Sequence, residues 1–229
     1  MFNSKEAEKV TESSFISKTI QPGNCIARIT DISLEVPSYD SNAYNLVLSL
    51  ETQPILDEKF EGFLIDKDNP ELGHHAGQVA KVNSSPFSYT DYTTKDGTVL
   101  NKEQSIFKWI SLFSKEIGVS TAMSEANISG ETIEEYVNEA KPFLINNKYY
   151  HFCIAGAEYE NKAGYIQHRL YLPKLDKGKT YIESYIEGKE PSAKFTVFNP
   201  AVHIRKKKTA EAVNSFEGRD ASATDLTLD

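Results

Sequence analysis

Hydrophobic residues recur at every second position along several stretches of this chain, which is the period of β-strands. Within residues 24–36 the alternation changes parity between Ile29 and Ile32. Such a change predicts a β-bulge in a strongly curved strand. Further strands are expected at residues 44–50 and 60–65, and a succession of short curved strands is typical of a small barrel.

Two later stretches have helical periodicity instead. Residues 102–117 place their large apolar side chains on one stripe, and we expect Trp109 on this helix to lie in the core. A second helix is expected at residues 131–140, ending before Pro142 because proline disrupts a helix. We expect this helical insertion, at about residues 102–140, to pack across one end of the barrel.

Residues 148–173, KYYHFCIAGAEYENKAGYIQHRLYLP, predict a β-hairpin with a turn around residues 161–164. We expect Tyr159 to pair with Tyr165, which sets the register of the two strands. Because side chains alternate between the faces of a strand, one face of the hairpin is apolar and is expected in the core. Its members are Tyr150, Phe152, Ile154, Ile166, His168, Leu170 and Leu172.

The opposite face combines aromatic rings and an arginine with a floor of small alanines, Ala155 and Ala157. Flat rings and a guanidinium group suit stacking on nucleobases. The alternative is a two-sided core strand pair in a β-sandwich, since aromatic residues favour strands in general. The members of this face are Tyr149, His151, Tyr159, Tyr165, Arg169 and Tyr171.

Charge is distributed unevenly along the chain, whose net charge is −8. Residues 1–140 hold 11 Lys/Arg and 22 Asp/Glu, residues 141–208 hold 13 and 6, and residues 209–229 hold 1 and 5. The basic part is therefore the part with the aromatic hairpin, and a few cations along a groove are enough to contact phosphates. A solvated basic face is the alternative. The candidate phosphate-binding residues are Lys81, Lys148, Lys162, Arg169 and Lys174.

The sequence has no phosphate-binding loop, dinucleotide fingerprint or nucleophile elbow, so we expect a protein that is not an enzyme. The spacing of carboxylates still leaves a metal-dependent nuclease open. Cys25 and Cys153 are expected to be reduced core thiols, and no cysteine or histidine spacing indicates a metal site or a cofactor. No apolar run matches a signal peptide or the about 20 residues of a membrane span, so we expect neither secretion nor membrane insertion.

The ends of the chain differ from its middle in composition. Residues 1–20 are polar and predict a flexible arm, whereas residues 209–229 are small, polar and acidic and predict a disordered tail. One domain is expected between them, at residues 21–208. The order of strands, helical insertion and hairpin predicts a mainly β (α+β) fold, an elaborated oligonucleotide-binding (OB) barrel.

Three stretches also resemble a known family: PGNCIARITDISLE, GQVAKV with the following FSYTDY, and IAGAEYENKAGY with LYLPK. They are similar to the single-stranded DNA-binding proteins of tailed bacteriophages, especially crAss-like phages, over about residues 20–205. The resemblance implies an OB-fold without the zinc cluster of some relatives. It also implies a protein that coats single-stranded DNA during phage replication or recombination, in the cytoplasm of the bacterial host.

The resemblance further implies that the acidic tail recruits a polymerase, helicase or primase and competes with DNA. The candidate partner-binding residues of the tail are Asp220, Asp225, Leu226, Leu228 and Asp229. A different interpretation is a β-rich phage structural or assembly protein whose tyrosine face is buried against another subunit. The sequence leaves open the oligomeric state and the preference between DNA and RNA.

Overall fold

A computed structural model gives the fold of most of the chain. It describes residues 20–52, 78–93, 95–173, 181–186, 189 and 198–207. Several predictions concern residues outside these ranges: the strand at residues 60–65, Lys174, the N-terminal arm and the acidic tail with its five candidate residues.

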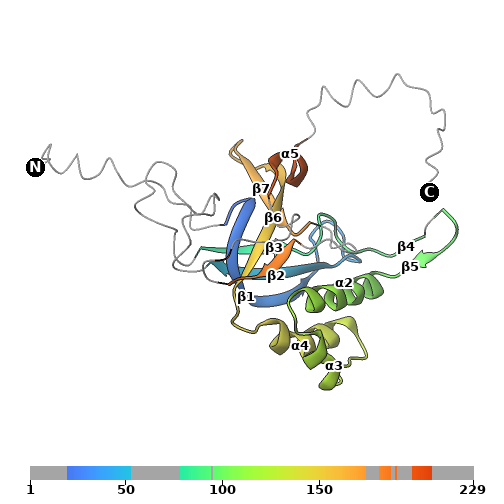
Figure 1. Cartoon of the computed structure of the whole chain (residues 1–229). Coiled ribbons are helices and arrows are strands. Elements are labelled where there is room, and N and C mark those ends of the chain that lie inside the picture. The colour runs from blue at the N-terminus through green and yellow to red at the C-terminus, as the bar shows by residue number, and fades with distance from the viewer. Residues whose placement is uncertain are drawn as a thin grey trace, which may run out of the picture.

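Five strands close into a barrel in the order β1-β2-β3-β7-β6, because β6 pairs back with β1 (Figure 1). Neighbouring strands are antiparallel except β3 and β7, which are parallel. This order, with helices inserted between the third and fourth barrel strands, is consistent with an OB-like barrel, so the predicted fold class is confirmed. The barrel strands are β1 (Gly23–Glu35), β2 (Asn45–Thr52), β3 (Val79–Asn83), β6 (Tyr150–Glu160) and β7 (Ile166–Tyr171).

The predicted bulge in β1 is confirmed. The register of β1 against β2 shifts between Ile29 and Asp31, and the hydroxyl of the intervening Thr30 donates to the carbonyl oxygen of Ser49 at 3.2 Å. The bend lets the first half of β1 pair with β6 and its second half with β2. A single long strand thus contributes to two sides of the closed barrel.

Three helices cover one end of the barrel (Figure 1): α2 (Lys102–Glu116), α3 (Ser120–Glu125) and α4 (Ile133–Leu144). Asn101 caps α2, its side-chain oxygen accepting the N–H of Glu103 at 2.7 Å. Trp109 is 8% exposed and stacks on Phe113 with ring centroids 4.5 Å apart, which confirms its predicted place in the core. The insertion therefore seals the barrel with apolar side chains.

The helix α4 continues through Pro142 to Leu144, so the predicted end before the proline is wrong. Pro142 lies in the last turn of the helix, where a missing N–H removes one hydrogen bond without breaking the preceding turns. Leu144 is fully buried and Phe143 is partly buried, and their packing stabilises the continued turn.

The remaining elements are short. The strands β4 (Tyr92–Thr93) and β5 (Val99–Leu100) form a separate hairpin. After the barrel, β8 (Ile182–Ser184), α5 (Pro200–His203) and β9 (Ile204–Arg205) lie along β6, and both β8 and β9 pair with it. No described helix has the length and apolar character needed to cross a membrane.

Candidate nucleic-acid interface

The β6–β7 hairpin forms where the sequence predicts it, but with a different register. Tyr159 pairs with Gln167, not with Tyr165. The connection is two residues longer than the predicted pairing implies: the Asn161 N–H donates to the Tyr165 carbonyl at 2.9 Å, and Gly164 adopts a φ of 83°. The pairing has shifted by two residues, so every side chain keeps its predicted face.

The apolar face of the hairpin lies inside the barrel over most of its length. Five of the seven predicted members are buried there: Tyr150, Phe152, Ile154, Leu170 and Leu172. The predictions for Ile166 and His168 are wrong, because Ile166 is 53% exposed and His168 is partly exposed. Both residues lie near the tip of the hairpin, which projects beyond the barrel (Figure 1).

The outer face of the hairpin is covered at the end away from its tip. Two residues that were predicted to lie on an open stacking face are therefore buried. His151 is 3% exposed and Tyr171 is 6% exposed, so neither lies on an open stacking face. The ring of Tyr185, in the segment after β8, packs against His151 with ring centroids 5.3 Å apart. Arg205 of β9 lies close enough to Tyr171 for its charge to act on the phenol.

His203, the last residue of α5, packs against the outer face of β6. Its ring lies over β6 with Nδ1 3.6 Å from the Cys153 sulfur, and Nδ1 also accepts the Asn199 N–H at 2.9 Å. Burial lowers the pKa of His203 and raises the pKa of the Cys153 thiol to about 12. Cys25 and Cys153 are both free and buried, as predicted, and burial raises the pKa of the Cys25 thiol as well.

The hairpin is open towards its tip. Tyr159 is 42% exposed and Tyr165 is 70% exposed, and Lys162 in the turn is also exposed. The Tyr159 hydroxyl donates to the side-chain oxygen of Gln167 at 2.8 Å, which fixes one ring across the two strands. Two tyrosine rings and a cation therefore meet solvent at this end of the molecule.

Two arginines flank Ala157 just below these tyrosines. Arg169 of β7 is its partner on one side, and Arg205 of β9 is its partner on the other. Partners in adjacent strands share a face, so the two arginines lie on the outer face with backbones about 10 Å apart. In the described part of the chain, neither guanidinium has a carboxylate partner.

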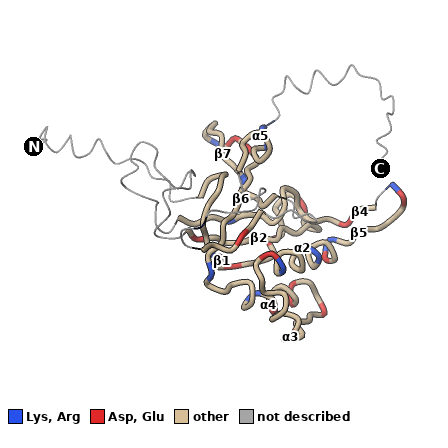
Figure 2. Tube along the Cα trace, viewed as in Figure 1, with Lys and Arg blue, Asp and Glu red and all other residues tan. Residues whose placement is uncertain are grey.

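The carboxylates of the hairpin lie on its other face. Glu158 accepts the Lys207 N–H at 3.1 Å, and Glu160 forms an ion pair with the Lys207 ammonium group, which lowers the pKa of Glu160. Figure 2 shows basic and acidic positions close together in this region of the trace. Because side chains alternate along the strand, Glu158 and Glu160 lie on the face opposite to that of Ala157 and its two arginine neighbours.

An exposed phenylalanine extends the outer face. The guanidinium carbon of Arg205 lies 4.5 Å from the centroid of the Phe87 ring, which is 64% exposed. The loop that carries Phe87 is held by a hydrogen bond between Ser88 and Tyr39, and the Tyr39 ring is 65% exposed. We call Phe87, Tyr159, Tyr165, Arg169 and Arg205 the arginine–tyrosine surface.

The sequence reasoning missed Phe87 and Arg205 as members of this surface. Their only local signals are the aromatic run FSYTDY and the basic run that starts at Arg205. Neither run indicates that the two residues touch, because they are far apart in the chain and meet only through the pairing of β9 with β6. The structure thus brings three separate segments to one surface.

Other predicted residues lie elsewhere. The Lys81 ammonium is 2.6 Å from a carboxylate oxygen of Glu35, which raises the pKa of Lys81 and leaves it ion-paired on the outer face of β3. Lys148 and Tyr149 lie before β6, at its end away from the tip. Ten residues of extended strand separate Tyr149 from Tyr159, a distance of about 33 Å.

Among the described residues, no group of three or more His, Cys, Asp or Glu side chains could hold a metal ion. Comparison of the chain with known protein families, with curated proteins and with solved structures found no match.

Proposed function

We propose that this protein binds single-stranded DNA without sequence preference, through the arginine–tyrosine surface. The observation that carries the proposal is the pair Arg169 and Arg205 on either side of Ala157, next to exposed aromatic rings. Guanidinium groups bind phosphates, and exposed rings stack on bases. Neither contact depends on which base is present, so binding is independent of sequence.

The rings favour single strands over duplexes. Stacking on a side chain needs a base whose face is free, and the base faces inside a duplex are already stacked on their neighbours. The extended stretch from Ala157 to Asn161 spans about 13 Å, which limits the open part of the hairpin to a few nucleotides.

The fold supports the proposal by analogy. Many OB-folds hold oligonucleotides with the loops that join the first to the second and the fourth to the fifth barrel strand. In this chain the first of these loops, between β1 and β2, contains the exposed Tyr39. The second, between β6 and β7, is the turn at residues 161–165. The net charge of −8 is compatible with the proposal because DNA responds to the local field at the arginines.

We propose further that the protein coats exposed single strands during phage DNA replication or recombination. The support for this setting is the resemblance of the sequence to phage single-stranded DNA-binding proteins. Recruitment of a polymerase, helicase or primase by the acidic tail belongs to the same proposal.

A second candidate is a structural or assembly protein in which the tip of the hairpin is a subunit interface. Tyr165 and Ile166 are both more than half exposed. Residues 166–170 of β7 pair with β6 on one side, and no described strand pairs with them on the other side. An exposed edge strand with apolar neighbours favours contact with another chain.

One experiment separates the two candidates. Fluorescence anisotropy would measure the affinity for labelled oligo-dT and for duplex DNA of equal length, at about 50 and about 200 mM salt. DNA coating predicts that oligo-dT binds more tightly than the duplex and that its affinity falls steeply with salt. Absence of binding, together with a stable oligomer in analytical ultracentrifugation, would favour the subunit interface.

A further inference from the structure

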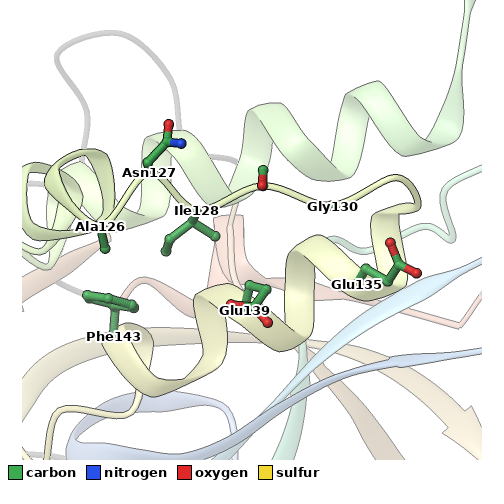
Figure 3. A pocket seen from close by; sticks show the side chains of 8 residues that line it. Ala126, Asn127, Ile128, Gly130, Glu135, Glu139 and Phe143 are labelled. Carbon is green, nitrogen blue, oxygen red and sulfur yellow. The ribbon is translucent and has the colours of Figure 1, made fainter.

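The connection between α3 and α4 borders an open hollow of about 490 Å³ on the exposed face of α4. In Figure 3, Ile128 points from the connection towards α4, and Phe143 rises from α4 beside Ala126. These three side chains form the apolar part of the hollow. Glu135 and Glu139, one turn apart on α4, line it with carboxylates.

The walls of the hollow are held in place by the chain itself. A Cβ atom on Gly130 would lie 2.5 Å from the backbone nitrogen of Tyr136, so the connection packs directly on α4. Glu135 accepts the Glu131 N–H at 2.8 Å and completes a capping box with Thr132. Binding in this hollow would therefore require little ordering of the protein.

The surroundings are strongly acidic. The chain has five glutamates from Glu125 to Glu139, and it has no lysine or arginine between Lys115 and Lys141. Lys141 itself forms an ion pair with Asp31 on the barrel. Glu139 has neither a hydrogen bond nor an ion pair with any described residue, so its charge faces solvent.

A further exposed apolar group lies where α2 meets α4. Phe107 of α2 is 50% exposed and contacts Tyr136 of α4, with ring centroids 4.9 Å apart. Exposed apolar groups rimmed by charge mark sites that bind another molecule. An acidic rim repels DNA phosphates and attracts cationic groups.

We propose that this hollow is a docking site for a basic segment of a partner protein. One bulky apolar side chain of the segment fills the space between Ile128 and Phe143, and flanking lysines or arginines contact Glu139. The volume lies within the range of about 300 to 1,000 Å³ that is usual for ligand sites. The proposal does not rest on DNA binding.

The position of the hollow allows both surfaces to be occupied together. The helices α3 and α4 lie at one end of the molecule, and the tip of the hairpin lies towards the other (Figure 1). A partner on the helices would leave the arginine–tyrosine surface free. Partner binding and DNA binding are therefore expected to be independent.

The test uses a fluorescent peptide, Lys-Lys-Leu-Phe-Lys-Lys, titrated with the full chain and followed by anisotropy. We expect binding that weakens about tenfold when Ser-Ser replaces Leu-Phe. Glu139→Lys, which reverses a rim charge, and Ala126→Trp, which fills the hollow without changing charge, should each weaken binding about tenfold. Glu116→Lys, an exposed site on α2 outside the hollow, is the matched control and should bind as the wild type does.

Three results would overturn the proposal. One is the absence of peptide binding up to about 1 mM protein. Another is an equal loss of affinity in Glu139→Lys and Glu116→Lys, which indicates attraction by net charge alone. The third is self-association of the wild type that Glu139→Lys abolishes, because the occupant would then be a second copy of this chain. The affinity of Glu139→Lys for oligo-dT, expected to be unchanged, separates this site from the DNA surface.

Discussion

Arg169 and Arg205 lie on opposite sides of Ala157, one on each strand that neighbours β6 at this point. Their backbones are about 10 Å apart, which is close to the Debye length of about 10 Å at 0.1 M salt. At this separation salt weakens the repulsion between the two charges, whereas a phosphate placed over Ala157 is closer to both and is attracted to both. The small side chain of Ala157 leaves the space that such a phosphate needs.

This arrangement predicts that Ala157→Glu weakens binding to oligo-dT at least about tenfold. The new carboxylate would form ion pairs with the two guanidinium groups and repel phosphates. Ala157→Gln is the matched control, since it has the same size without the charge, and should lose only a small part of the affinity. Equal losses in the two variants would mean that bulk, and not charge, is what disturbs the surface.

The exposed tyrosines are predicted to stack on bases. Stacking is worth about 1–3 kcal/mol per base, so Tyr159→Ala with Tyr165→Ala should weaken oligo-dT binding by a similar factor at low and high salt. Replacing both tyrosines by phenylalanine should retain most of the affinity. Tyr92→Ala, a 55% exposed tyrosine on β4, is the control and should bind normally. Normal binding by the double alanine variant would exclude stacking at the hairpin tip.

Lys162 in the turn is predicted to contact one phosphate. The slope of log affinity against log salt should become shallower by about 0.7 in Lys162→Ala, the value for one phosphate contact with a single strand. Lys148→Ala provides the comparison, because Lys148 lies at the far end of β6. We expect an unchanged slope for Lys148→Ala, and a shallower one would place the DNA along the whole of β6.

The periodicity of the sequence was sufficient for the local elements of the fold. It located the bulge near Ile29, the helix α2, the buried Trp109 and the two faces of the hairpin, because each depends on residues close together in the chain. It placed Ile166 and His168 in the core because alternation cannot show where the barrel ends.

The candidate site was harder to predict because it depends on contacts between distant segments. Local alternation assigned His151 and Tyr171 to the outer face but could not show that β8, Tyr185, α5 and β9 lie along that face. The ion pair of Lys81 with Glu35 crosses β2 and is equally invisible in the sequence. Arg205 enters the surface only through its pairing with β6.

Gly156 lies where the hairpin leaves the barrel, and its lack of a side chain is predicted to be essential for packing. A Cβ atom at this position would lie 2.5 Å from the Pro22 ring and 3.0 Å from the His168 ring. Gly156→Ala should therefore lower the free energy of unfolding by about 1–3 kcal/mol. Urea unfolding followed by the fluorescence of Trp109, the single tryptophan, measures this change.

A second variant separates the two contacts of Gly156. Adding Pro22→Ala removes the shorter contact, so the double variant should lose less stability than the sum of the two single changes. Strict additivity would show that Pro22 is not what the new methyl group meets.

The buried His203, which packs against β6, predicts that the protein becomes less stable as the pH is lowered. Burial among Tyr181, Phe198 and Cys153 lowers the pKa of His203, and its Nδ1 already accepts the Asn199 N–H. The unfolded chain, with a histidine pKa of about 6.5, binds more protons than the folded chain below that pH. The free energy of unfolding should therefore decrease from pH 7.5 to pH 5.5.

His203→Gln tests the origin of this decrease. The variant should be less stable at pH 7.5 but should lose less stability on acidification than the wild type does. Some loss should remain, because burial also lowers the pKa of His151. Urea unfolding at several pH values measures the difference, and an identical pH dependence in the two proteins would contradict the assignment to His203.

The central claim is that Arg169 and Arg205 together bind the phosphates of a single strand. The most direct test is the salt dependence of oligo-dT binding by Arg169→Gln with Arg205→Gln, compared with Lys108→Ala with Lys115→Ala, two exposed lysines on α2. The account predicts a slope shallower by about 1.4 for the arginine variant, two contacts of about 0.7 each, and an unchanged slope for the lysine variant. A slope that is the same in the arginine variant and the wild type would contradict it.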